Sequence, residues 1–141
     1  MPTMIQTLYK IVEQNTFNIA KNIKLLICDL DSVFSDGRIY MSENGEKLKT
    51  FHTRDGYGVK SLMNAGVKVA IVTCRKSNIV ENHMHALSIS LIYQGQEDKL
   101  KAYHDICDKL KVSPQYTGYI DDDLIDWSVM EKVALKVCVC R

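Results

Sequence analysis

The chain has 141 residues, of which 46% are hydrophobic and 25% charged, and 18 basic against 17 acidic residues leave a net charge of +1. This length predicts one domain, the composition excludes a largely disordered chain, and the charge balance argues against nucleic acid or an anionic membrane as a partner. No apolar run approaches the ~18 residues of a transmembrane helix. The N-terminus lacks the apolar core of a signal peptide, and the five cysteines include no CxxC pair. We therefore expect a cytoplasmic protein with reduced cysteines.

The first half of the chain predicts two helices, a strand and a hairpin. Apolar residues recur at helical spacing near the N-terminus, and a continuous apolar run that ends in Asp29 is typical of a buried strand. Asn44-Gly45 is a strong signal for a two-residue hairpin turn. Gly66 suits the end of a helix. In chain order we predict a helix over 4–19, a strand over 23–28, a hairpin within 38–52 and a helix over 55–66.

The second half predicts a regular alternation of strands and helices. The predicted elements are strands over 67–72, 91–93, 116–120 and 135–140, with helices over 78–87, 97–112 and 124–133 between them. Near-continuous apolar strands that alternate with helices are typical of a parallel sheet covered on both faces. We therefore expect an α/β fold, a Rossmann-like parallel sheet with helices on both faces and a β-hairpin flap.

Polar side chains follow the predicted strands, at the carboxyl ends where such sheets bind ligands. The residues concerned are Asp29 and Asp31 after the first strand, Thr73, Cys74 and Arg75 after the second, Lys99 at the next helix, and Asp121, Asp122 and Asp123 after the fourth strand. Carboxylates from two strands suit Mg²⁺, while hydroxyl, guanidinium and ammonium groups suit a phosphate. This combination predicts phosphoryl-transfer chemistry.

The spacing of Asp29 and Asp31 suggests separate catalytic roles for the two carboxylates. One can attack phosphorus as a nucleophile. The other can protonate the leaving oxygen and then act as base for a water molecule. Lys99 can pair with the nucleophile, and a cation can neutralise the phosphate that the nucleophile approaches.

These residues resemble the four motifs of the haloacid dehalogenase superfamily. The closer resemblance is to its capless branch, the 3-deoxy-D-manno-octulosonate 8-phosphate phosphatases, and it extends from about residue 23 to residue 140, within one expected domain over 1–141. The segments that carry it are CDLDSVFSDGRIY, GEKLKTFHTRDGYGVK, VAIVTCRKSNIVENH, LIYQGQEDKLKAYHDIC and YIDDDLIDWSVMEKV. Each motif is short, but their order and spacing are highly specific.

The resemblance implies a role for each matched position. Asp29 matches the nucleophile that becomes an aspartyl-phosphate, and Asp31 matches the general acid and base. Thr73 and Lys99 match the residues that bind the transferring phosphoryl group. The implied Mg²⁺ ligands are the carboxylates of Asp29 and Asp122 and the main-chain carbonyl of Asp31, with Asp123 and Asp126 nearby.

The resemblance also implies a substrate site, a cofactor and an assembly. The matching substrate-binding positions are Ser32, Arg54, Gly56, Cys74 and Arg75. The hairpin would be a flap, and in the family four subunits assemble so that neighbours help to close each site. The implied reaction is Mg²⁺-dependent hydrolysis of a sugar-acid phosphate in lipopolysaccharide precursor synthesis. A nonulosonate 9-phosphate is the alternative substrate.

The sequence departs from the family pattern in two respects. Ser32, Cys74 and Asp121 stand where the family usually has glycine, and the family's glycine-containing tail is not expected, because the sequence ends at Arg141. A catalytically weak scaffold therefore stays an alternative, as does a receiver domain that takes phosphate on aspartate. If Asp121 turns toward the cation, its charge should hinder phosphate binding.

Other chemistry-bearing residues carry simpler interpretations. His83 and His85 are two apart on a predicted helix, so we expect surface histidines rather than a metal pair. Cys138 and Cys140 share one face of a predicted strand, and we expect them to be buried as small apolar side chains.

Overall fold

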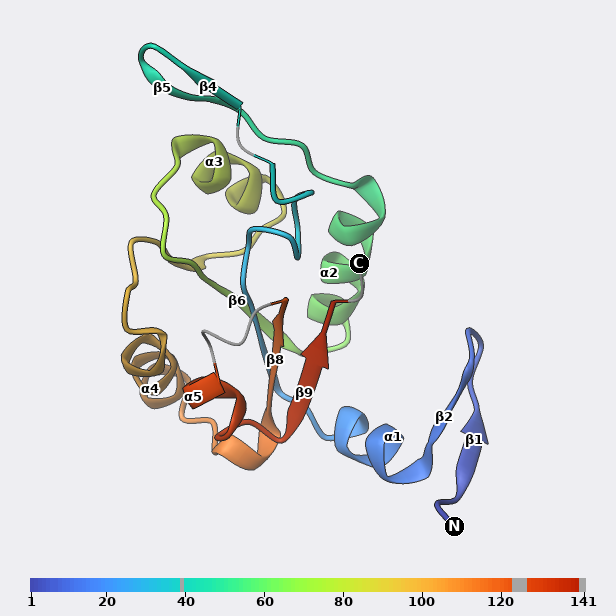
Figure 1. The fold of residues 1–141 in the computed structure, drawn as a ribbon. Helices are drawn as coiled ribbons and strands as arrows, with labels where there is room; N and C mark the ends of the chain where they lie inside the picture. Colours follow the sequence, from blue (N-terminus) through green and yellow to red (C-terminus); the bar gives the residue numbers. More distant parts are fainter. Residues whose placement is uncertain (39, 123–126, 140–141) are drawn as a thin grey trace.

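The computed structural model describes residues 1–38, 40–122 and 127–139 and contains one central sheet (Figure 1). The sheet is built from β3 (Leu25–Cys28), β6 (Lys68–Val72), β7 (Leu91–Tyr93), β8 (Thr117–Asp121) and β9 (Leu135–Cys138), all parallel. The connecting helices are α2 (Thr53–Asn64), α3 (Asn78–Ala86), α4 (Lys99–Leu110) and α5 (Trp127–Met130), with a 3₁₀ turn at Pro114–Tyr116. The predicted α/β fold is confirmed.

The strand order is β7-β6-β3-β8-β9. Numbered by position along the chain, these strands run 3-2-1-4-5, the Rossmann order, whereas receiver domains have the order 2-1-3-4-5. The order excludes the receiver-domain alternative. It also makes β3 and β8 neighbours at the point where the winding reverses, and ligands bind outside the carboxyl ends of the strands at such a point.

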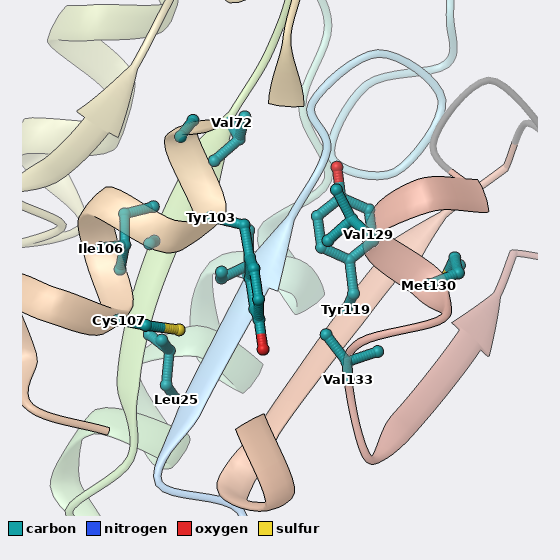
Figure 2. Close-up of a cluster of buried hydrophobic side chains, with 12 residues drawn as sticks. Leu25, Val72, Tyr103, Ile106, Cys107, Tyr119, Val129, Met130 and Val133 are labelled. Atoms are coloured by element: carbon teal, nitrogen blue, oxygen red, sulfur yellow. The ribbon is translucent and has the colours of Figure 1, made fainter. Parts of the chain in front are cut away.

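Side chains of β3 alternate between two cores, because successive residues of a strand point to opposite faces. Leu25 and Ile27 pack with the side that contains α4 and α5, while Leu26 and Cys28 pack with the side that contains α2 and α3. Figure 2 shows the first core, in which Tyr103 of α4 lies among aliphatic side chains. The sheet is therefore covered on both faces, which fixes its rim as the exposed ligand site.

The N-terminal segment differs from the helix predicted over 4–19. It forms a hairpin of β1 (Met4–Gln6) and β2 (Ile11–Glu13), followed by α1 (Gln14–Lys21). Thr7 stabilises the turn, because its hydroxyl donates to the carbonyl of Lys10 at 2.6 Å and accepts from the Lys10 N–H. Leu8 and Tyr9 at the turn are 95% and 92% exposed, so a helix here has no core to bury its apolar side chains against.

The other predicted elements agree with the structure to within a few residues. The predicted hairpin is β4 (Tyr40–Ser42) with β5 (Gly45–Leu48), and it extends away from the sheet in Figure 1. The two residues between the strands are Glu43 and Asn44, so the turn lies one residue earlier than the predicted Asn44-Gly45 turn. Gly45 begins β5 with φ +105°, a conformation that glycine adopts easily. We call this hairpin the flap. Residues 124–126 of the predicted helix over 124–133 lie outside the described residues.

Two predictions about side-chain burial are wrong in part. Cys138 is exposed, because β9 is an edge strand whose residues alternate between partly buried and exposed, and Cys140 lies outside the described residues. His85 is on the surface, but His83 is half-buried and stacks on Phe51 with 4.0 Å between ring centroids. Burial lowers the pKa of His83. No helix in the described part of the chain is long and apolar enough to cross a bilayer.

Alkaline pH should destabilise the fold, because two buried acids must stay protonated. Burial raises the pKa of Cys28 and of Tyr103 to about 12 each. The unfolded chain loses these protons near pH 8.5 and 10, so the native state binds more protons above those values and stability falls. We expect the free energy of unfolding in urea to fall from pH 8 to pH 11, by on the order of 1 kcal/mol per pH unit for each group. Tyr103→Phe should flatten the fall above pH 10. A constant free energy in the wild type would contradict this.

Candidate active site at the sheet rim

The structure brings together the predicted residues at the carboxyl ends of β3, β6 and β8. Asp29 directly follows β3, and its backbone N–H donates to the carbonyl of Ile120 on β8 at 3.0 Å. Thr73 directly follows β6, and Asp121 is the last residue of β8. Parallel strands of matching register therefore deliver these three side chains to one edge.

Lys99 joins two of the carboxylates at this edge. Its ammonium Nζ lies 3.3 Å from Oδ1 of Asp29 and 4.0 Å from Oδ2 of Asp121. The Lys99 side chain is 8% exposed, and the Asp29 and Asp121 side chains are 13% and 1% exposed. Lys99 is the first residue of α4, and this start of the helix positions it at the edge of the sheet. Asp98 caps the helix there, because its side chain accepts from the Lys101 N–H. The pairing of Lys99 with Asp29 expected from the sequence is present in the structure.

Three carboxylates form a group that can hold a metal ion. Oxygen atoms of Asp29, Asp121 and Asp122 lie within 4.8 Å of one another, and Oδ1 of Asp121 also accepts from the Asp122 N–H at 2.6 Å. A partly buried cluster of carboxylate oxygens fits a small hard cation such as Mg²⁺. Two of the three predicted ligand residues are in this group. Asp31 was predicted to contribute its carbonyl rather than its side chain, and Asp123 and Asp126 lie outside the described residues.

Asp121 faces the site rather than the solvent. Its side chain belongs to the acidic group, which is the orientation in which it adds negative charge where a phosphate would bind. The structure thus adds Asp121 to the candidate ligands, although the resembled family usually has glycine at this position.

Cys28, the last residue of β3, directly precedes the candidate nucleophile Asp29 in the chain. It is buried, and that burial, together with the neighbouring Asp29 carboxylate, raises the pKa of its thiol to about 12. A thiol with such a pKa stays protonated near neutral pH and is a poor nucleophile. The nucleophile at the end of β3 is therefore better assigned to Asp29 than to Cys28.

Asp31 contacts a residue that the sequence did not indicate. Nζ of Lys49, just beyond the flap strand β5, lies 2.7 Å from Oδ1 of Asp31. The Lys49 side chain is fully buried, whereas that of Asp31 is 28% exposed. Lysines and glutamate in a hairpin arm are typical of a solvated surface, so no local pattern could have singled out Lys49.

The loop after β6 is held by the segment after β7. The Thr73 N–H donates to the Tyr93 carbonyl at 2.9 Å, and the Thr73 carbonyl accepts from the Gln96 N–H. The Gln94 side chain accepts from the Ser77 N–H at 2.8 Å and donates to the Ser77 carbonyl at 3.2 Å. These bonds fix the backbone at Thr73, which is buried at the end of β6. Gln94 is a second residue that the sequence did not indicate.

The predicted substrate-binding residues have different surroundings. Cys74 and Arg75 are exposed beside Thr73, and Arg54 is exposed in the first turn of α2. Gly56 is buried, and a Cβ there would lie 3.0 Å from a methyl group of Leu87, so its small size serves the packing beneath α2. Ser32 has φ +70°, so it adopts the left-handed conformation that glycine reaches easily.

Comparison with known proteins gives relatives over nearly the whole chain. The chain is 48% identical over 135 residues to the 3-deoxy-D-manno-octulosonate 8-phosphate phosphatase of Yersinia pestis, covering 96% of this chain and 72% of the relative. A solved structure from Vibrio cholerae, described as a phosphatase of the same kind, is 69% identical with a TM-score of 0.91, covering 96% of this chain and 75% of that one. No protein-family model matches the chain.

A third comparison bears on the cofactor. The solved 3-deoxy-D-manno-octulosonate 8-phosphate phosphatase of Moraxella catarrhalis holds a magnesium ion, a phosphate ion and the sugar acid. It is 37% identical to this chain with a TM-score of 0.80, over 84% of this chain and 68% of that one. The acidic group described above therefore lies in a fold that binds magnesium and phosphate in that protein.

Proposed function

Because the chain belongs to the 3-deoxy-D-manno-octulosonate 8-phosphate phosphatases of the haloacid dehalogenase superfamily, we propose that it hydrolyses this sugar-acid phosphate in lipopolysaccharide precursor synthesis. It is a phosphoric monoester hydrolase with Mg²⁺ as its cofactor. One observation supports the proposal most: Lys99 holds Asp29 inside a group of carboxylates at the rim between β3 and β8. Such a site joins a nucleophile, a cation site and a phosphate-binding ammonium group.

The proposed reaction has two displacements at phosphorus. A carboxylate oxygen of Asp29 forms a bond to phosphorus while the bond to the sugar oxygen breaks, and Asp31 donates its proton to that oxygen. Water then attacks the aspartyl-phosphate, Asp31 takes a proton from the water, and phosphate leaves with Asp29 restored. Thr73 and Lys99 hold the phosphoryl oxygens through both steps.

The proposed Mg²⁺ ligands are the carboxylates of Asp29 and Asp122 and the main-chain carbonyl of Asp31, with Asp121 as the further carboxylate found in the acidic group. Bound there, the cation neutralises charge on the phosphoryl oxygens. The exposed Arg75 and Arg54 are proposed to contact the substrate's sugar acid, while Ser32 and Cys74 line the phosphate site. Gly56 is proposed to act through the packing of α2.

The finer parts of the proposal concern location and assembly. We propose a cytoplasmic protein, consistent with exposed free thiols at Cys74 and Cys138. We also propose a homotetramer, supported by the exposed apolar residues Tyr40, Met41 and Leu48 of the flap, which an intersubunit contact would cover. We propose that residues 1–141 act as a single domain, since the described part contains one central sheet.

Phosphate release with Mg²⁺ tests the function. The substrates are 3-deoxy-D-manno-octulosonate 8-phosphate, a nonulosonate 9-phosphate and an unrelated sugar phosphate. We expect the first to have the highest kcat/KM. A preference for the second would assign the alternative substrate, and no release above the uncatalysed rate from any of them would favour an inactive scaffold. The uncatalysed reaction is so slow that even weak catalysis is measurable.

Removing the charge of Asp121 should improve turnover. Three carboxylates within 4.8 Å place negative charge where a dianionic phosphate binds, and unit charges ~6 Å apart repel by roughly 3 kcal/mol at an effective dielectric constant of ~20. Lys99 offsets part of this. We expect Asp121→Gly to raise kcat/KM several-fold at saturating Mg²⁺ and to weaken Mg²⁺ binding slightly.

Asp121→Asn is the matched control, because it removes the charge but keeps an acceptor for the Asp122 N–H. Kinetics over a Mg²⁺ titration should give the same direction for both variants. An unchanged or lower kcat/KM in both variants would show that the charge of Asp121 does not hinder phosphate binding.

A further inference from the structure

Lys49 is a buried cation that the reaction described above does not use. Its side chain is fully buried, although its neighbours Leu48 and Thr50 are exposed. Burying an ammonium group is costly unless a partner of opposite charge and good geometry compensates. Asp31 is such a partner at 2.7 Å. The chain thus places a buried positive charge against the residue proposed as the general acid and base.

The backbone on both sides of this pair is held in place. After Lys49, Phe51 forms a bridge with Ser35 and stacks on His83 of α3. On the other side, Asp31 is the second residue of a tight turn in which the Val33 and Phe34 N–H groups donate to the Leu30 carbonyl. Lys49 therefore reaches Asp31 from a fixed point at the base of the flap.

Asp31 needs such a restraint in order to act as an acid. Its side chain is 28% exposed, so solvent is available to it in other orientations. A general acid must stand within hydrogen-bond reach of the oxygen that it protonates. The Lys49 bond occupies Oδ1 and so limits the directions in which the rest of the carboxyl group can point.

We propose that Lys49 is a positioning residue that orients the Asp31 carboxyl group toward the leaving oxygen of the substrate. The proposal rests on the proposed phosphatase function and deepens it. Lys49 should therefore matter only when the bond to a poor leaving group is cleaved, because only such groups need a proton from Asp31. It also links the base of the flap to the acid, so both must be in place for the sugar phosphate to react.

Two substrates with different leaving groups test this role in a single turnover. The sugar phosphate leaves as an alkoxide that needs a proton, whereas p-nitrophenyl phosphate leaves as a stable anion. We expect Lys49→Met to slow release of the sugar by about 10²-fold or more, and release of p-nitrophenolate by no more than about threefold, in the first turnover at saturating Mg²⁺. Lys49→Arg, which keeps the charge, should recover part of the loss. Lys101→Met, at an exposed site on α4, is the control and should change neither rate.

If Lys49 had only a structural or phosphate-binding role, Lys49→Met would slow the reactions of both substrates equally, and that result would overturn the proposal. An unchanged rate with the sugar phosphate would overturn it as well. If Lys49→Met does not fold, Lys49→Arg serves as the test variant. We then expect its release rate to fall only with the sugar phosphate. A wild-type protein that hydrolyses neither substrate would refute the phosphatase function and this role together. An active wild type with no leaving-group dependence in the variants would refute this role alone.

Discussion

Replacing Asp29 by asparagine should abolish turnover while the protein stays folded. The amide has nearly the same shape as the carboxylate but cannot attack phosphorus and form an aspartyl-phosphate. Loss of a nucleophile removes several orders of magnitude of catalysis in other hydrolases, so we expect a fall in kcat of at least about a thousandfold. Phosphate release at saturating substrate and Mg²⁺ measures it, and circular dichroism checks the fold.

The control is Asp108→Asn, the same chemical change at an exposed position on α4. It should leave kcat within about twofold, as surface substitutions usually do. Turnover of Asp29→Asn within tenfold of the wild type would contradict the covalent mechanism. Asp31→Asn tests the second step of the same reaction. Turnover should be severely reduced, yet with p-nitrophenyl phosphate, whose leaving group needs no proton, the aspartyl-phosphate should accumulate, because water activation then lacks its base. Intact-mass spectrometry detects that adduct.

Chelation of the metal should have an effect of similar size. EDTA should remove activity, and added Mg²⁺ should restore it. Asp122→Ala should raise the Mg²⁺ concentration needed for half-maximal activity by at least about tenfold, since it takes one carboxylate from the group that Asp29 and Asp121 complete. Ca²⁺ should bind but support little turnover, because its looser and larger coordination misplaces the attacking oxygen.

Binding can be measured separately from activity. Mg²⁺ that binds the native state raises the melting temperature with concentration. This rise should shift to higher Mg²⁺ in Asp122→Ala but not in Asp108→Ala, because Asp108 is an exposed residue near the opposite end of α4 from Lys99. Full activity of the wild type in excess EDTA would refute the metal site.

The candidate site was largely predictable because its residues follow apolar runs. Asp29, Thr73 and Asp121 each stand where a strand ends, and an apolar run followed by a polar residue marks that end in the sequence. Lys99 was predictable because a helix with regular apolar spacing begins there. The pairing of Lys99 with Asp29 then follows from the parallel sheet, whose strands end at one edge.

The errors arose where the same local pattern fits two structures. The apolar residues of the N-terminal segment fit a helix, yet β-branched Ile5 and Val12 pair across a short hairpin whose turn Thr7 stabilises. Alternation placed Cys138 on one face of a strand, but it could not say that β9 lies at the edge of the sheet with that face exposed.

The sequence by itself determined which residues stand at the rim of the sheet, because each strand's apolar run and its end are local properties. Apart from the pairing of Lys99 with Asp29, only the tertiary structure decided which of them meet. The order β7-β6-β3-β8-β9 sets β8 beside β3 and so brings Asp121 and Asp122 to Asp29. The return of the chain from the flap buries Lys49 against Asp31, 18 residues earlier. Such contacts depend on how distant segments pack together, and the spacing of residues along the chain does not encode that packing locally.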